Sequence, residues 1–339
     1  MSSTTDRRLK PWHLPFLLLL IVGSIVILSK SRKQQVYQTT QGFVFGTTYK
    51  ITYRYGRDLR PEIEAAMKRV DNALSMFNDS STISRINHNE PVNAAADTSF
   101  IKVFRLAQSI SERTDGVFDI TVAPAVNAWG FGFKNSENIT DSTIDSLRQI
   151  IGYTMVREQD GRIVKDDGRI MLDCSAIAKG YGCDAVAEAL SAEGITDYMV
   201  EIGGEVVVKG KNAKGLDWSI GVSNPNEDMP ASGNSLNTIL HLTDCAMATS
   251  GNYRNFYEKD GVRYAHTIDP KSCRPVSHSL LSATVIAKDC ATADAFATSF
   301  MVMGADSATA LVSRTPELKA YLIVATESGL ESIDLTGLN

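Results

Sequence analysis

The sequence predicts an α+β fold, and three observations lead to this prediction. Segments that alternate as strands do and segments with helical spacing follow one another in irregular order, which is typical of α+β proteins. The chain contains no internal repeat. Its 339 residues, 43% of them hydrophobic, are enough to bury the core of one large domain or of two modest lobes.

The charge and the cysteines argue against several classes of protein. A formal net charge of -5, with no long basic stripe beyond the N-terminus, argues against a nucleic-acid partner. The five cysteines are odd in number, lack any C-x-x-C or zinc-ligand spacing, and stand among apolar neighbours. We therefore expect small buried side chains at these positions, and neither a disulfide framework nor a zinc site.

The N-terminus differs in character from the rest of the chain. An almost purely apolar run, Leu14–Leu28, follows three basic residues, and no A-x-A-like cleavage site comes after it. We expect an uncleaved signal-anchor that crosses a membrane, and no lipoprotein anchor, because no cysteine precedes Cys174. Basic residues flank both ends of the run, so charge alone does not fix its orientation. The predicted organisation is a cytoplasmic tail over 1–13, an anchor over 14–29, a linker over 30–41 and a folded domain over 42–339.

The first half of the folded domain predicts one strand and then mostly helices. Phe43–Tyr53 alternates and is rich in aromatic residues and threonine, so we expect a strand with a bulge or close contact at Gly46. Pro61 stands where a helix begins, and apolar residues recur after it at helical spacing. We expect helices over Glu62–Phe77, Thr98–Thr114 and Ser142–Ile151, with a polar loop after the first and the mixed segment ITVAPAVNAWGFGF before the last.

The segment LDCSAIAKGYGCD, which ends at Asp184, is the part of the sequence that most suggests a binding site. Arg169–Leu172 predicts a strand that enters the core, and Asp173 stands where a helix N-cap belongs. The first turn of a helix offers unpaired N–H groups to an anion, and Lys179 adds a positive charge. The pattern is not a Walker A loop. The segment therefore predicts either a phosphate site or an ordinary strand–helix junction with a surface lysine.

The second half predicts more strands and one long helix. Tyr198–Val208 is either two strands interrupted by Gly203–Gly204 or one strongly bent strand. A helix is expected over Cys290–Met303, closed by Gly304. Further strands are expected over Trp218–Val222, Leu240–Leu242, Ala246–Thr249, Arg263–Ile268 and Ala283–Ala287.

Two places late in the chain suggest chemistry. Asp294 and Thr298 are four residues apart on the predicted helix, so their oxygens share one face. These hard oxygen ligands suit Mg²⁺ bound together with substrate phosphates, although a solvated helix face has the same pattern. His266 stands at a predicted strand end beside a turn, where it is either a structural residue or a general base.

Taken together, several blocks resemble the FAD:protein FMN transferase (ApbE) family in both content and order. The blocks are FGTTY, MFNDSSTISRIN, GVFDITVAPAVNAWGFG, LDCSAIAKGYGCD, VEIGGE, TSGNY, HTIDP and DAFAT. They extend from about Gly42 to Gly304, which is nearly the whole folded domain.

The resemblance implies a two-lobed, mixed-sheet α+β fold that binds FAD between the lobes. It also implies Mg²⁺-dependent transfer of the FMN moiety to a Thr or Ser hydroxyl of a target protein, with release of AMP. His266 matches the residue proposed as the general base in family members. Mg²⁺ would be held by the Ala176 carbonyl, Asp294 and Thr298, and FAD would be lined by Phe45, Phe77, Val117, Phe118, Asp119, Asp173, Lys179 and Ile268.

The sequence departs from the family pattern at a few positions. Phe45 and Phe77 stand where Met and Tyr are common, and Cys273 stands where a glycine is expected in a turn. None of these changes removes a metal ligand or the base.

The resemblance places the catalytic domain in the periplasm, at the bacterial inner membrane, and suggests a membrane redox subunit as the acceptor. Two alternatives stay open. In one, water replaces the acceptor hydroxyl and the protein is a Mg²⁺-dependent FAD diphosphatase that yields FMN and AMP. In the other, the protein binds flavin without catalysis.

Overall fold

The structure is a computed structural model that describes residues 36–131, 139–223, 236–252, 256–259 and 262–338, together with positions 22 and 24. Within the described residues no helix is both long enough and apolar enough to cross a bilayer. Apart from those two positions, the predicted anchor over 14–29 lies outside the described residues, and it stays a prediction.

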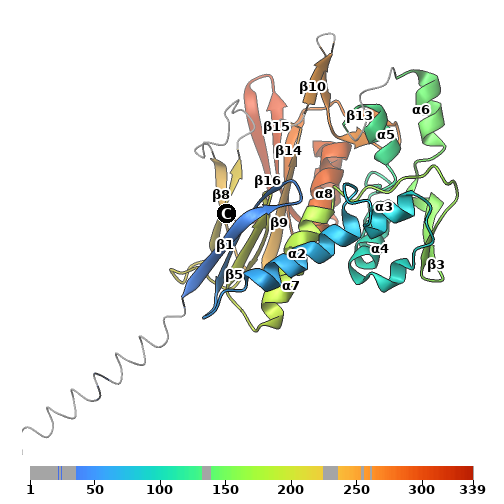
Figure 1. Cartoon of the computed structure of the whole chain (residues 1–339). Helices are drawn as coiled ribbons and strands as arrows, with labels where there is room; N and C mark the ends of the chain where they lie inside the picture. Colours follow the sequence, from blue (N-terminus) through green and yellow to red (C-terminus); the bar gives the residue numbers. More distant parts are fainter. Residues whose placement is uncertain are drawn as a thin grey trace, which may run out of the picture.

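An eight-stranded sheet dominates the fold (Figure 1). Every described pairing between its neighbouring strands is antiparallel, so the expected mixed sheet is wrong for these strands. Antiparallel neighbours are what short connections such as hairpins produce. In spatial order the strands are β1 (Tyr37–Val44), β2 (Thr47–Arg54), β5 (Tyr198–Ile202), β6 (Glu205–Lys209), β9 (Cys245–Gly251), β14 (Leu280–Ala287), β15 (Lys319–Thr326) and β16 (Gly329–Leu335).

Helices and two-stranded pairs surround this sheet, together with short 3-10 helices at Ala94–Ala96 and Tyr153–Met155. The α-helices are α2 (Arg60–Leu74), α3 (Thr82–Asn87), α4 (Thr98–Arg113), α5 (Ala123–Ala128), α6 (Asp141–Arg148), α7 (Ala178–Ala192), α8 (Cys290–Met303) and α9 (Ala305–Ser313). The two-stranded pairs are β3 (Val156–Gln159) with β4 (Arg162–Lys165), β7 (Trp218–Ser223) with β8 (Leu236–Leu242), β10 (Phe256–Lys259) with β11 (Val262–Ala265), and β12 (Ile268–Asp269) with β13 (Arg274–Pro275). The α+β class is confirmed.

The large sheet is covered on both faces. On β14, Val285 belongs to the core that α4 and α8 share, whereas its neighbour Ile286 packs with Trp218 and Leu240 of the β7–β8 hairpin. Successive side chains of a strand point to opposite faces, so helices cover one face and the hairpin covers the other. This double burial explains why β14 is an almost unbroken apolar run.

The strand predicted over Phe43–Tyr53 is a hairpin. β1 and β2 pair from Tyr37 with Arg54 to Val44 with Thr47, and the two residues between them, Phe45 and Gly46, have φ of 51° and 75°. A two-residue turn of type I′ needs positive φ at both positions, which glycine adopts freely and phenylalanine does at a cost. The chain therefore reverses at Gly46 and does not bulge. β1 also takes up the last residues of the predicted linker.

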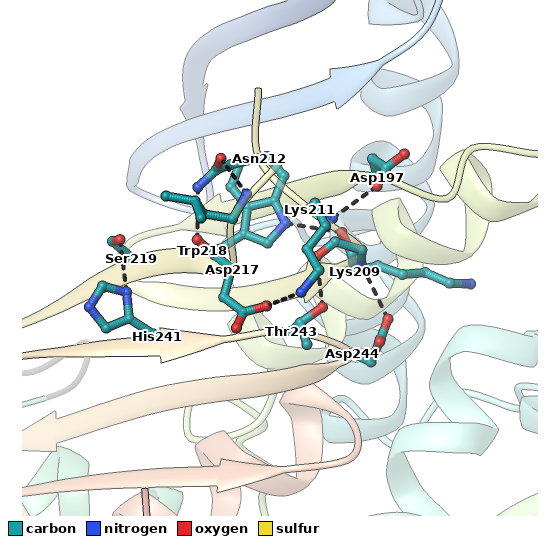
Figure 2. A network of polar contacts seen from close by, with 12 residues as sticks. Asp197, Lys209, Lys211, Asn212, Asp217, Trp218, Ser219, His241, Thr243 and Asp244 are labelled. Atoms are coloured by element: carbon teal, nitrogen blue, oxygen red, sulfur yellow. Dashed lines mark hydrogen bonds and ion pairs between the residues drawn. The ribbon is translucent and has the colours of Figure 1, made fainter. Parts of the chain in front are cut away.

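Tyr198–Val208 forms two strands, β5 and β6, joined by a turn, which confirms the first of the two predicted alternatives. Ile202 pairs with Glu205 across the turn Gly203–Gly204. At the opposite end of this hairpin, a polar network closes the loop that leads to β7 (Figure 2). There the Lys211 N–H donates to Asp197 Oδ1 at 2.9 Å, and the Trp218 indole N–H donates to the Lys209 carbonyl at 3.0 Å. This network fixes the far end of the hairpin and leaves the glycine turn for the site described below.

The strand predicted over Arg169–Leu172 is wrong. The segment is buried at Ile170 and Leu172, but Leu172 bonds to a side chain and not to a neighbouring strand. Asn87, the last residue of α3, accepts from the Leu172 N–H at 2.7 Å and donates to the Leu172 carbonyl at 2.9 Å. The predicted N-cap at Asp173 is also wrong, because α7 begins at Ala178 with Ile177 as its N-cap residue.

Candidate active site

The crossing of α7 and α8 fixes the predicted residue Asp294. The Gly180 N–H donates to Asp294 Oδ2 at 3.0 Å. A Cβ atom on Gly180 would lie 2.3 Å from the carbonyl oxygen of Cys290, so only glycine allows this close approach. The carboxylate of Asp184 accepts hydrogen bonds from the N–H groups of Cys290 and Ala291, both at 2.8 Å. The two helices are therefore joined at two points.

Lys179 forms an ion pair with Glu205, a residue with no predicted role. The Lys179 Nζ donates to Glu205 Oε1. Glu205 is the first residue of β6, and its side chain is only 3% exposed, whereas that of Lys179 is 34% exposed. The ammonium group is thus anchored from inside the protein while the lysine side chain still reaches solvent.

The charges at this crossing leave an excess of negative groups. Burial raises the pKa of Asp294, an effect that Lys179 and the Gly180 N–H oppose. Burial and the charge of Asp294 also raise the pKa of Glu205, and Lys179 opposes this shift too. Burial lowers the pKa of Lys179, but the charges of Asp294 and Glu205 outweigh it and raise that pKa overall. The lysine therefore stays cationic. Two carboxyl groups against one ammonium favour a further cation.

The oxygen donors near Asp294 fit a hard divalent cation. Thr298 lies one turn further along α8, and its Oγ1 is 3.1 Å from Ser250 Oγ of β9. Ala176 lies half-buried in the turn that leads into α7. The described residues contain no group of three His, Cys, Asp or Glu side chains that could hold a metal ion by themselves. One carboxylate, a hydroxyl and a carbonyl suit Mg²⁺, which often takes its other ligands from water and substrate phosphates.

Two predicted carboxylates lie on neighbouring segments. The Asp173 N–H donates to the Ile120 carbonyl at 2.6 Å, which brings Asp173 next to the segment of Asp119. Asp119 Oδ1 accepts from the N–H and the hydroxyl of Thr121, both at 2.7 Å, and Asp173 Oδ1 accepts from the Ser175 N–H at 2.7 Å. Burial raises the pKa of both carboxyl groups. Val117 and Phe118 precede Asp119 directly; Val117 is half-buried and Phe118 is buried.

The two predicted phenylalanines differ in their surroundings. The ring of Phe45 lies against α7, because a Cβ atom on Gly182 would be 2.6 Å from Phe45 Cε2. Phe77, between α2 and α3, is 85% exposed. The hairpin tip thus carries the Phe45 ring to the helix of Lys179, whereas Phe77 lies largely on the surface.

His266, the predicted base, follows β11. Its neighbour Thr267 links this segment to the strand β9, which contacts the predicted metal ligand Thr298. Thr267 Oγ1 donates to Asn252 Oδ1 at 2.6 Å, and Asn252 lies just after the end of β9, the strand whose Ser250 contacts Thr298. Ile268, at the start of β12, is buried. The segment of the predicted base is therefore tied to the strand that also contacts α8.

Comparison with known proteins identifies the family. The sequence model of the ApbE family matches residues 45–322, which include every candidate site residue. The chain belongs to the ApbE family. It is 36% identical to the FAD:protein FMN transferase of Vibrio cholerae over 322 residues, covering 92% of this chain and 95% of that protein. It is 33% identical to the FAD:protein FMN transferase of Haemophilus influenzae, covering 92% and 93%.

Solved structures of ApbE proteins have the same fold. The flavin transferase ApbE from Vibrio cholerae superposes with a TM-score of 0.78 at 34% identity, over 89% of this chain and 97% of that one. The apo flavinyl transferase ApbE from Pseudomonas stutzeri also gives a TM-score of 0.78, at 30% identity, over 89% and 95%.

Three residues that hold the candidate active site of this ApbE protein together have no predicted role. Glu205, Ser250 and Asn252 lie in the blocks VEIGGE and TSGNY, which carried the resemblance but received no role. The only sequence signal is their place beside glycines, at the start of a strand for Glu205 and at the end of a strand for Ser250 and Asn252. Their partners are distant in sequence, and no helical or strand periodicity connects them.

Cys273 shows how the ApbE turn tolerates a residue other than glycine. Its φ is 56°, so it keeps the left-handed conformation that glycine adopts without strain. Its N–H donates to the Asp269 carbonyl at 2.8 Å, and its own carbonyl accepts from the Trp129 indole N–H at 2.8 Å. These bonds and complete burial hold the strained residue in place.

We expect Cys273→Gly to be more stable than Cys273→Ala by about 1 kcal/mol. Both variants remove the buried sulfur, but only glycine relieves the left-handed strain. Urea unfolding of the two variants measures the difference directly, and equal midpoints with equal slopes would contradict the strain at this position.

Gly180→Ala should destabilise this ApbE protein by about 1–3 kcal/mol, because the new methyl group meets backbone that cannot rotate away. Gly56→Ala is the matched control, since a Cβ atom there meets nothing within 4 Å. Thermal unfolding of both variants checks the prediction. Equal melting temperatures for the two would show that α7 and α8 do not pack as closely as described.

Proposed function

We propose that this protein is a FAD:protein FMN transferase. It transfers the FMN moiety of FAD to a Thr or Ser hydroxyl of an acceptor protein. The hydroxyl oxygen forms a bond to the FMN phosphorus, the bond to the AMP phosphate breaks, and AMP leaves while the hydroxyl proton passes to a base. The observation that carries the proposal is the junction of Lys179, Asp294 and Thr298 at the α7–α8 crossing of an ApbE fold.

Phosphoryl transfer needs positioning and charge compensation more than covalent help from the protein. Mg²⁺, when bound, would neutralise charge on the phosphate oxygens. Asp294, Thr298 and the Ala176 carbonyl are the groups that would hold it. Lys179 would bind the pyrophosphate with its partly exposed ammonium group. His266 would accept the proton of the attacking hydroxyl, because imidazole titrates near neutrality.

The flavin and adenine rings need apolar surfaces and a few polar contacts. Phe77 offers an exposed ring on which a base can stack, and Phe45 offers a ring at the tip of the β1–β2 hairpin. Asp119 and Asp173 offer buried carboxyl groups as hydrogen-bond partners. FAD would bind between the sheet and the helical part, where it is lined by Phe45, Phe77, Val117, Phe118, Asp119, Asp173, Lys179 and Ile268.

Incubation of the purified protein with FAD and Mg²⁺, with and without an acceptor protein, tests the proposal. We expect acid-precipitable flavin only when acceptor is present, together with AMP. Free FMN and AMP in both reactions would show a diphosphatase instead. Bound FAD without any AMP would show a flavin-binding protein without this activity.

We also propose that Leu14–Leu28 anchors the protein in the bacterial inner membrane, with the catalytic domain in the periplasm. Its apolar length and the absence of a cleavage site support this. The acceptor would then be a protein accessible from the periplasm, such as a membrane redox subunit.

Protease added to spheroplasts should therefore degrade the domain from about residue 42 onward. A periplasmic protein and a cytoplasmic protein serve as the two controls. Protection of the domain while the periplasmic control is cut would refute the proposed orientation.

A further inference from the structure

Glu205 follows a tight turn of two glycines that makes room for its buried side chain. It follows Gly203 and Gly204, which both have positive φ, at 65° and 103°. A Cβ atom on Gly203 would lie 2.8 Å from Thr47 Cγ2 and 3.3 Å from Glu205 Oε2. The glycine turn therefore leaves room for the carboxylate to lie beneath the hairpin.

The carboxylate is also costly to bury. One oxygen, Oε1, accepts from Lys179, whereas Oε2 is buried and has no hydrogen-bond partner among the described residues. Burying an ionised carboxylate away from water is strongly unfavourable unless a partner compensates its charge. A glutamine would fill the same space without this charge, so the negative charge itself needs an explanation.

The ammonium group of Lys179 has two carboxylates within electrostatic reach. It bonds to Glu205, and the charge of Asp294 also acts on it. A lysine side chain is long and flexible, so its position depends on its partner. Without Glu205, Lys179 would turn to Asp294, which is the only charged side chain in the proposed metal site.

We propose that Glu205 is a positioning residue that holds the Lys179 ammonium towards the pyrophosphate of FAD and away from Asp294. The inference rests on the proposed function. It assigns Glu205 two effects that a space-filling role does not have. The residue strengthens the binding of FAD without any metal, and it leaves Asp294 available to a divalent cation.

Four variants test these effects. Glu205→Gln keeps the shape and removes the charge, while Glu205→Asp keeps the charge and shortens the side chain. Lys179→Met, alone and combined with Glu205→Gln, shows whether Glu205 acts through the lysine. Glu201→Gln is the matched control, because Glu201 loses the same charge from the same hairpin and its side chain points to the opposite face from its neighbours Val200 and Ile202.

The first measurement is the dissociation constant of FAD in EDTA, from the quenching of flavin fluorescence. A charge-assisted hydrogen bond is roughly twice as strong as a neutral one, so Lys179→Met should weaken FAD binding on the order of 10-fold to 100-fold. Glu205→Gln should weaken it several-fold, and Glu205→Asp should bind more tightly than Glu205→Gln. The double variant should bind no more weakly than Lys179→Met, and Glu201→Gln should bind as the wild type does.

The second measurement is the rise in melting temperature that Mg²⁺ causes without FAD. We expect a smaller rise in Glu205→Gln than in wild type or Glu201→Gln, because Lys179 then competes for Asp294. An equal rise in Glu205→Gln and wild type would overturn the part of the proposal that concerns Asp294.

Two other outcomes would overturn the role of Glu205 in FAD binding. One is tighter FAD binding by Glu205→Gln than by Glu205→Asp, which indicates that shape matters and charge does not. The other is a loss of FAD affinity from Glu205→Gln that is as large in the Lys179→Met background as in the wild type. If the wild type binds no FAD either with or without Mg²⁺, the proposed function fails and the inference fails with it. If it binds FAD only with Mg²⁺, the inference alone fails, because it assigns Glu205 an effect on FAD binding without metal. Binding by the wild type with one of the two outcomes overturns the inference alone.

Discussion

Asp294→Ala should abolish FMN transfer, with a loss on the order of 10³ or more in rate. Asp294 is the one charged side chain among the proposed metal ligands, and a bound metal supplies several kcal/mol of transition-state stabilisation. Thr298→Ala removes a neutral ligand and should weaken transfer less. The measurement is the rate of transfer over a series of Mg²⁺ concentrations. Full activity of Asp294→Ala at limiting Mg²⁺ would refute the metal assignment.

Loss of stability must be separated from loss of chemistry in this variant. Asp294 also accepts the Gly180 N–H, so alanine leaves a buried donor without its partner. Asp289→Ala is a suitable control, because Asp289 caps the same helix α8 through the Thr292 N–H at 2.9 Å. It should lower the melting temperature while the folded fraction keeps its activity.

His266→Ala should lose transfer by on the order of 10²–10⁴ while it keeps its affinity for FAD and its melting temperature. A hydroxyl attacks poorly until a base takes its proton, and a base works only when it is unprotonated. The wild-type rate should therefore rise with pH through the titration of an imidazole, and the variant should lose this acid limb. Transfer rates across pH, FAD binding and thermal unfolding are measured on one preparation of the variant.

His278→Ala is the matched control for His266. The His278 ring nitrogen Nε2 lies 2.8 Å from the Met301 carbonyl, so this histidine fastens the end of α8. Its removal should lower the melting temperature and leave the pH profile unchanged. An unchanged transfer rate in His266→Ala, or a rate that only follows its folded fraction, would end the proposal that His266 is the base.

The helix of the metal ligands could be predicted from sequence to the residue. α8 runs from Cys290 to Met303 as expected, because its spacing is regular, Asp289 caps its start and Gly304 at φ 80° ends it. Local rules suffice where each residue depends on neighbours within a turn. Asp294 and Thr298 share one face for the same reason.

Sequence reasoning failed where distant groups decide the local structure. Arg169–Leu172 has the apolar content of a strand, but the Asn87 side chain bonds both backbone groups of Leu172 from 85 residues away. The sequence predicts one strand with a bulge or close contact at Gly46 where the structure has the β1–β2 turn, because phenylalanine rarely adopts positive φ. Sequence periodicity does not identify Glu205 as a site residue, because Lys179 lies 26 residues earlier in the chain and only the packing of α7 on the sheet brings the two together.

The most direct test of the central claim uses FAD that is labelled separately in its flavin and in its adenine. After incubation with Mg²⁺ and acceptor, the labels are counted in the acid-precipitated acceptor and in solution. Our account predicts that the acceptor carries the flavin label only, with one adenine label released as AMP for each flavin bound. Both labels on the acceptor, or the flavin label in free FMN, would contradict it.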